Sequence, residues 1–272
     1  MLIGMNLISE FVESVIMTGR LKYHEPVSVL LIAGPESGKT SVVNQRRCKA
    51  IQVFSDVTGK GLVEICKTQP EVSHVVLNDL VAIMSHKQTV NRYTLAMINA
   101  MTEEGIQALA TPGGIEVFQN GKRGIIACLT SALANDGRSW WNKTGLTSRL
   151  LPFAFSHSSK LTLTIKALID ENGTAPSRKK EKSKDLRVPA KHVPVAIPRK
   201  FGASIRKIAD VKIQELHAAT DEQGYRRLKQ FQSLACGHAL RRSFRNPTVG
   251  QPEIDFLQRI LPYISYDKLT PL

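Results

Sequence analysis

A glycine-containing loop with a lysine and a threonine is the part of the chain best equipped for chemistry. The segment LLIAGPESGKTSVV, from Leu30 to Val43, fits the pattern G-x-x-x-x-G-K-[ST]. In such a loop backbone N–H groups surround nucleotide phosphates, the lysine reaches the β and γ phosphates, and the threonine hydroxyl binds Mg²⁺. We therefore predict a site for ATP and Mg²⁺, with Lys39 catalytic and Thr40 on the metal, formed by Gly34, Pro35, Glu36, Ser37, Gly38, Lys39, Thr40 and Ser41.

A second acid is expected at the end of a neighbouring hydrophobic strand, where it holds Mg²⁺ through water. The segment HVVLND supplies Asp79, which we predict to be a metal-side and catalytic residue. Many ATPases carry Asp-Glu at this point, and the glutamate activates the attacking water. This chain has Asn78-Asp79 instead. Either Asp79 serves the metal and the base comes from elsewhere, with Glu103 and Glu104 as distant candidates, or Asp79 is the base and Asn78 lies on the metal side.

Alternating strands and helices must position these residues. The continuous aliphatic run at 27–33 is typical of a buried parallel strand, and a helix is expected to follow the loop. This alternation predicts an α/β fold, a doubly wound parallel sheet of the P-loop type. Further strands are expected at 52–55 and 74–77 and a helix at 89–104, and Asn120-Gly121 predicts a hairpin turn between strands 115–118 and 123–129.

The chain is expected to divide into four segments. Residues 1–24 form a helix that ends at a glycine, 25–170 form the ATPase core, 171–200 form a basic linker, and 201–272 form a small all-helical lid subdomain. Between residues 177 and 200 there are nine Lys and Arg against two Asp and Glu, with several prolines nearby, so we expect an extended and mobile segment. Three helices are expected at 201–218, 222–243 and 252–261.

The overall charge points to a polyanionic partner. The formal net charge is +14 and the sequence pI is about 9.8, which favours either nucleic acid or an anionic membrane face as the partner. No apolar run approaches the ~20 residues of a membrane span, and the first residues lack the features of a signal peptide, so we expect a cytoplasmic protein without a membrane partner. The four cysteines are scattered, which predicts reduced thiols and neither a zinc site nor a disulfide framework.

Several later segments, taken in order, resemble AAA+ ATPases. A strand that ends in Thr130, the segment GLTSRLLPF with Arg149, and the segment YRRLKQFQSLACGHALRR from Tyr225 are the features that carry the resemblance. It is closest to the minichromosome maintenance (MCM) helicases and the MCM-like ATPases of phages and mobile elements. The resemblance implies that Thr130 is the polar sensor at the strand end, that Arg149 is an arginine finger for a neighbouring subunit's nucleotide, and that Arg226, with Arg227 as the competing register, is the sensor of the lid helix.

The same resemblance implies contact with DNA and assembly into an oligomer. A hairpin before the Thr130 strand would point into a central channel with Lys122 and Arg123 at its tip, and the basic linker, including Lys179 and Lys180, could neutralise phosphates without reading sequence. The loop departs from the small-residue variant usual in MCM proteins.

We therefore expect a hexameric ring or open spiral that couples ATP hydrolysis to DNA translocation, unwinding or remodelling in replication, as helicase, loader or initiator. The alternatives are a slowly hydrolysing nucleotide-dependent switch that organises partners on DNA, favoured by the missing second acid, and a small-molecule phosphotransferase.

Overall fold

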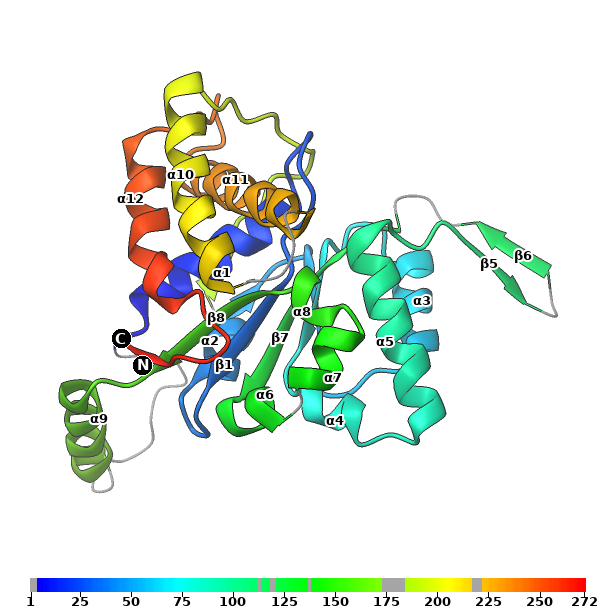
Figure 1. The fold of residues 1–272 in the computed structure, drawn as a ribbon, viewed down its shortest axis with the longest axis horizontal. Coiled ribbons are helices and arrows are strands. Elements are labelled where there is room, and N and C mark those ends of the chain that lie inside the picture. Colours follow the sequence, from blue (N-terminus) through cyan, green and yellow to red (C-terminus); the bar gives the residue numbers. More distant parts are fainter. Residues whose placement is uncertain (1–3, 112–113, 118–120, 137, 173–183, 217–221) are drawn as a thin grey trace.

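A six-stranded parallel sheet forms the centre of the molecule. The computed structural model describes residues 4–111, 114–117, 121–136, 138–172, 184–216 and 222–272 (Figure 1). The strand order is β10-β8-β1-β7-β4-β3, and every neighbouring pair is parallel. The bounds are β1 Val29–Ala33, β3 Ile51–Phe54, β4 His74–Leu77, β7 Gly124–Thr130, β8 Leu151–Ser156 and β10 Thr270–Pro271. This confirms the predicted α/β class with a parallel sheet.

Helices cover both faces of this sheet because its strands are apolar on both sides. In β1, Val29, Leu31 and Ala33 belong to one core cluster, and Leu30 and Ile32 to the other. The first cluster includes residues of α1 Asn6–Thr18, α2 Lys39–Asn44, α10 Arg199–Leu216, α11 Glu222–Arg242 and α12 Gln251–Ile260. The second includes residues of α3 Gly59–Thr68, α4 Leu80–Met84, α5 Gln88–Glu103, α6 Ser131–Asp136, α7 Arg138–Lys143 and α8 Leu146–Arg149.

The first and last thirds of the chain meet in one helical layer. Helix α1 packs against α11, and the two backbones approach closely because Gly237 lacks a side chain: a Cβ there would lie 2.3 Å from the carbonyl oxygen of Ser14. Helix α1 ends at Gly19 as expected, but Gly19 has φ −71°, an ordinary helical value. Space and not backbone conformation requires this glycine, since a Cβ would lie 2.3 Å from Ser73 Oγ.

The expected C-terminal helices are present. They are α10, α11 and α12, followed by a short 3₁₀ helix η1 Leu261–Tyr263 and the edge strand β10. Figure 1 shows them grouped with α1, and they share a continuous hydrophobic core with the sheet. In the part of the chain that the structure describes, none of the helices is long and apolar enough to cross a bilayer.

Part of the segment expected to be a mobile linker lies against the body of the protein. Strand β9 Lys184–Asp185 pairs with β2 Arg46–Arg47 in a small parallel sheet. Further along, Val193 bridges to Leu21 and Ala196 bridges to Thr248. Residues 184–198 therefore form defined backbone contacts, which corrects the expectation for this half of the segment. Residues 173–183, between α9 Ser159–Asn172 and β9, lie outside the described part.

The hairpin before β7 has a different register from the predicted one. Strand β6 Gly114–Val117 pairs antiparallel with β5 Ala108–Thr111, whereas β7 joins the central sheet between β1 and β4. The predicted pairing of 115–118 with 123–129 is therefore wrong, because the buried strand β7 gains two parallel partners in the sheet. The turn at Asn120 falls outside the described residues, as does the segment 112–113 that joins β5 to β6. In Figure 1 the β5–β6 hairpin projects away from the body of the molecule.

Candidate functional sites at the two edges of the sheet

The glycine-containing loop lies between β1 and α2, at the carboxyl edge of the parallel sheet. Glu36 and Gly38 have positive φ values of 58° and 76°, and Gly38 is the N-cap of α2. No side chain caps this helix end. The first N–H groups of an α-helix lack intrahelical partners and carry a partial positive charge, so they form a natural site for a phosphate group. The predicted strand, loop and helix are thus all present.

Lys39 lies folded against its own loop. Its Nζ donates a hydrogen bond to the Gly34 carbonyl at 3.1 Å. Burial lowers the pKa of Lys39, and the charge of the neighbouring Asp79 partly opposes that shift. A half-buried ammonium group close to a helix N-terminus is stabilised when an anion binds beside it. The lysine is therefore placed to move from the Gly34 carbonyl to a bound phosphate.

Thr40 lies next to the central strand β7. Burial raises the pKa of Cys128 to about 12, and nearby Lys39 and a hydrogen bond with Thr40 only partly offset this effect. Cys128 is consequently a neutral thiol. This contact places the Thr40 side chain between the loop and the sheet.

The other predicted residues of this site stand at the ends of β4 and β7. Leu77 lies opposite Ala127, and Ala33 lies opposite Thr130. Thr130 therefore ends β7, which lies beside the loop strand β1, and Asn78 and Asp79 follow β4, one strand further along the sheet. Asp79 is exposed and caps α4, since its Oδ1 accepts a hydrogen bond from Val81 N–H at 2.9 Å. A helix cap and a metal or base function compete for the same carboxylate.

Two buried oxygens mark this edge as a place for a further group. Among the described atoms, Ser37 Oγ and Asn78 Oδ1 are buried without a hydrogen-bond partner. Buried polar atoms are rarely left unpaired, and a ligand or water normally supplies the missing bond. Together with the uncapped helix and Lys39, these atoms fit a triphosphate and a hydrated Mg²⁺. In the described residues, no group of three or more His, Cys, Asp and Glu side chains is arranged to hold a metal.

His157 is a residue of this edge that the sequence analysis missed. It follows β8 directly, and its Nε2 lies 3.1 Å from the Ser37 carbonyl oxygen. Strands β8 and β7 are the two neighbours of β1, so the imidazole contacts the loop backbone from the β8 side of β1. The sequence signal is its position just beyond a buried strand.

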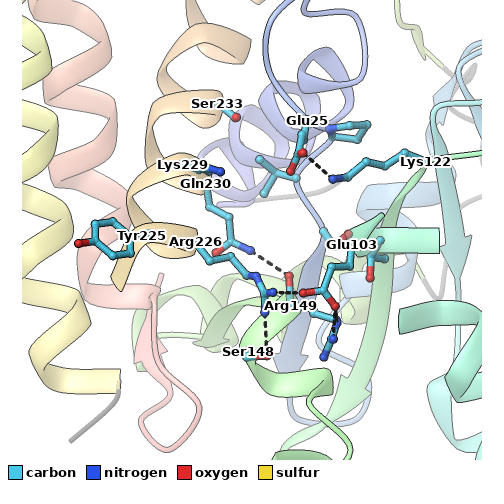
Figure 2. Close-up of a pocket in the computed structure, with 14 residues that line it drawn as sticks. Glu25, Glu103, Lys122, Ser148, Arg149, Tyr225, Arg226, Lys229, Gln230 and Ser233 are labelled. Atoms are coloured by element: carbon cyan, nitrogen blue, oxygen red, sulfur yellow. Dashed lines mark hydrogen bonds and ion pairs between the residues drawn. The ribbon is translucent and has the colours of Figure 1, made fainter. Parts of the chain in front are cut away.

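A second site lies at the opposite, amino edge of the sheet. It is a pocket of about 550 Å³ between the starts of β1 and β8, the end of α5 and the first turns of α11. Its charged lining residues are Glu25, Glu103, Lys122, Arg149, Arg226 and Lys229 (Figure 2). Ser28 lines this pocket and Gly34 begins the phosphate loop. The five residues of β1 lie between them, so six steps of ~3.3 Å separate the two positions by about 20 Å.

Arg149 and Arg226 share one carboxylate in this pocket. Glu103 forms ion pairs with both, through Oε2 to Arg149 and Oε1 to Arg226. Arg149 Nε donates to Oε2 at 2.9 Å. Figure 2 shows the carboxylate lying between the two guanidinium groups. Burial alone would raise the pKa of Glu103, but hydrogen bonds and charge from Arg149 and Arg226 outweigh it and hold the pKa below its usual value.

The structure separates the two neighbouring arginines of α11. Arg226 reaches the pocket and donates to Ser148 Oγ at 3.0 Å, whereas Arg227 is 1% exposed. Arg227 donates to the carbonyl oxygens of Leu150 at 3.1 Å and Thr147 at 2.7 Å. Arg227 therefore braces the backbone between α8 and β8, and Arg226 is the one placed to meet a ligand.

Arg149 and Arg226 thus lie together, and both lie apart from Lys39 of the same chain. The distant base candidates Glu103 and Glu104 are at this amino edge too, so neither reaches the phosphate loop of its own chain. Neither arginine therefore reaches the phosphate loop of its own chain.

The residues expected to contact DNA are placed differently from the prediction. Lys122 lies at the base of the hairpin and pairs with Glu25 at 2.6 Å, and Arg123 is 2% exposed and donates to the Lys122 carbonyl at 2.9 Å. Neither is at a hairpin tip, and Arg123 is too deeply buried to touch a DNA backbone. Lys179 and Lys180 lie outside the described residues. Trp141, in α7, is a core residue with 1% exposure.

No protein-family model matches this chain, and no curated protein matches it.

Proposed function

We propose that the chain is an oligomeric P-loop ATPase of the AAA+ type, with ATP and Mg²⁺ at the carboxyl edge of the sheet. The observation that carries this proposal is the phosphate loop in its full context: a buried parallel strand, a left-handed Gly38, an uncapped helix and Lys39 beside an exposed Asp79. In this proposal Thr40 binds Mg²⁺, Thr130 contacts the γ phosphate, and helices α10 to α12 act as the lid subdomain. Bound Mg²⁺ supplies charge neutralisation of the phosphates.

The arginine pair supports assembly with a defined geometry. A nucleotide at the carboxyl edge of one subunit and arginines at the amino edge of the next form a head-to-tail contact, and such contacts generate rings or open spirals. A guanidinium from the neighbour stabilises the charge that develops on the transferred phosphoryl group, an effect worth about 10³–10⁵ in rate. We propose Arg149 and Arg226 for this role, in a hexameric ring or an open spiral.

DNA is the proposed partner, and its remodelling, translocation or unwinding in replication is the proposed task. The formal charge of +14 supports a polyanionic partner, and phosphate contacts from lysine and arginine provide most of the affinity of sequence-independent binding. The basic segment that includes Lys179 and Lys180 stays in the proposal as a DNA contact. Lys122 does so only if its pair with Glu25 opens.

A second candidate function is a nucleotide-dependent switch that hydrolyses ATP slowly. The observation that favours it is Asn78, which stands where many ATPases have an acid, together with the use of Asp79 as a helix cap. A single carboxylate that must cap α4, hold the metal and activate water would be a poor base. The switch would organise partners on DNA without movement.

The test is ATP turnover against protein concentration, with and without single-stranded DNA. The ATPase proposal predicts that ATP turnover per chain rises steeply with protein concentration and is stimulated by DNA. Lys39→Ala is the control for turnover by contaminants and should be inactive. Nucleotide binding with negligible turnover under both conditions would favour the switch. Turnover per chain that does not change with protein concentration or with DNA would count against both oligomerisation and the DNA partner.

A further inference from the structure

We propose that Glu103 is a carboxylate latch: in a lone subunit it occupies the position between Arg149 and Arg226 that the triphosphate of a second copy takes on assembly. This inference rests on the proposed function, because it names the ligand of the arginine pair and the group that the ligand displaces. It concerns the pocket at the amino edge of the sheet, whereas the phosphate loop lies at the carboxyl edge.

The first observation is how completely the carboxylate is engaged. Each oxygen of Glu103 faces a different guanidinium, on elements far apart in the chain: Arg149 at the end of α8 and Arg226 in α11. Arginine forks match carboxylate and phosphate oxygens in the same way, so a carboxylate between two arginines resembles a phosphate in both charge and shape.

The second observation is where the carboxylate comes from. Glu103 is the last residue of α5, and Glu104 is its C-cap. The carboxyl end of a helix carries partial negative charge and favours cations, so an acidic side chain is unfavourable for the helix at this position. Glu103 contributes nothing to helix α5 by this effect, and its interactions are directed to the arginine pair.

The third observation is that each arginine makes hydrogen bonds besides those to Glu103. Arg149 Nη1 donates to the Gly145 carbonyl at 2.7 Å, and the Arg149 carbonyl accepts from Gln230 Nε2 at 2.9 Å. Arg226 keeps its bond to Ser148 Oγ at 3.0 Å. Withdrawal of the carboxylate would therefore leave two guanidinium groups already aimed into the pocket.

The fourth observation is the charge and exposure of the pocket. Lys122 is paired with Glu25, so displacement of Glu103 leaves the positive charges of Arg149, Arg226 and Lys229 for a ligand. The side chains of Arg149, Glu103 and Arg226 are 20%, 33% and 36% exposed. Ion pairs this open to water are weak, so a polyanion can replace the carboxylate.

The direct experiment measures binding of inorganic tripolyphosphate by calorimetry, in a Lys39→Ala background that disables the phosphate loop. Adding Glu103→Gln should tighten binding roughly tenfold, because it removes one like charge beside the anion and keeps the side-chain shape. Glu104→Gln changes the net charge equally outside the pocket and should have no comparable effect. Arg149→Ala combined with Glu103→Gln should abolish the gain.

Further measurements keep the test decisive. Glu103→Asp retains the charge and should not tighten binding, which distinguishes loss of charge from local loosening. In chains with Lys39 intact, Glu103→Gln should lower the protein concentration for half-maximal turnover several-fold, if the proposed function holds. Thermal melting identifies any variant that is not folded. Tripolyphosphate binding by the Glu103→Asp chain is then compared only among folded chains.

The outcomes separate the two proposals. Equal tripolyphosphate binding by the Glu103→Gln and Glu104→Gln chains overturns the latch even if turnover depends on assembly. Tighter binding by Glu103→Gln supports the latch as an anion site even if no assembly or turnover is found, in which case the proposed function fails alone. A gain for a thymidine oligonucleotide without a gain for tripolyphosphate would assign the pocket to DNA and overturn the inference.

Discussion

Two adjacent arginines of α11 provide a sharp test of the site, because the structure gives them opposite roles. Arg227 is 1% exposed and donates to the carbonyl oxygens of Thr147 and Leu150. Hydrogen bonds to a charged group contribute about 1.5–3 kcal/mol each. Arg227→Ala removes both of these bonds and the one to Gln230 Oε1 at 2.8 Å, and it opens space in the core, so we expect the free energy of unfolding to fall by at least about 3–5 kcal/mol.

Arg226 should behave in the reverse way. Its side chain is 36% exposed, and its ion pair with Glu103 is open to water. Such pairs contribute about 0–1 kcal/mol, so Arg226→Ala should leave the stability almost unchanged. Loss of one donor to the transferred phosphoryl group should lower turnover about 10²-fold.

The assay combines thermal melting with ATP turnover at saturating ATP and a protein concentration at which assembly is complete. At roughly 2–4 °C per kcal/mol, Arg227→Ala should lower Tm by about 10 °C, and Arg226→Ala by no more than about 4 °C. The reasoning is refuted if Arg226→Ala melts as early as Arg227→Ala, or if Arg227→Ala alone loses turnover with Tm unchanged.

Three further predictions concern the fold that positions the site. Burial lowers the pKa of His74 to about 4, so on acidification the unfolded chain takes up this proton before the folded chain does. The free energy of unfolding should therefore fall as the pH drops below 6.5, by about 2 kcal/mol between pH 7.5 and 5.0 in urea titrations. His74→Gln should reduce this loss. Burial alone would raise the pKa of Glu253, but hydrogen bonds from two basic side chains and a backbone N–H lower it to about 2. The ionised Glu253 therefore contributes fully to the free energy of unfolding above pH 4.5, and about 2 kcal/mol of this contribution should be lost between pH 5 and 3. An acid titration of the Glu253→Gln chain should lack that loss. Gly19→Ala should lower the free energy of unfolding by about 1–3 kcal/mol, because the added Cβ would lie 2.4 Å from Ser73 Cβ. In the control Gly202→Ala, the nearest neighbour of the added Cβ would be 3.8 Å away, so the free energy of unfolding should rise by up to about 1 kcal/mol. Denaturant midpoints would measure both changes.

The phosphate loop and the sheet could be predicted from the sequence because their signals are local. The aliphatic run before Gly34 and the lysine after Gly38 together specify strand, loop and helix within a short segment. The Asn120-Gly121 turn signal is equally local, yet it gave a wrong pairing. Strand β7 is buried and pairs with β1 and β4, and burial of a whole strand outweighs the preference of one turn.

The amino-edge pocket could not be predicted in the same way, because it joins distant segments. Glu103 and Arg226 are 123 residues apart in the chain. The sequence left Arg226 and Arg227 as competing registers, since adjacent positions of a helix differ only in the direction that they face. Burial in the folded chain decides between them. His157 was missed for a related reason: its partner is the backbone of the phosphate loop, which no side-chain pattern reveals.

The most direct test of shared catalysis between subunits is to mix two variants that are inactive alone. Arg149→Ala keeps the carboxyl-edge site, and Asp79→Ala keeps the arginine pair. In a head-to-tail assembly mixed at equal amounts, about a quarter of the interfaces, one half times one half, join an intact site to an intact Arg149. We predict that the mixture recovers a substantial part of that quarter of wild-type turnover. No recovery at any mixing ratio, with both chains folded, binding ATP and assembling together, would contradict the claim.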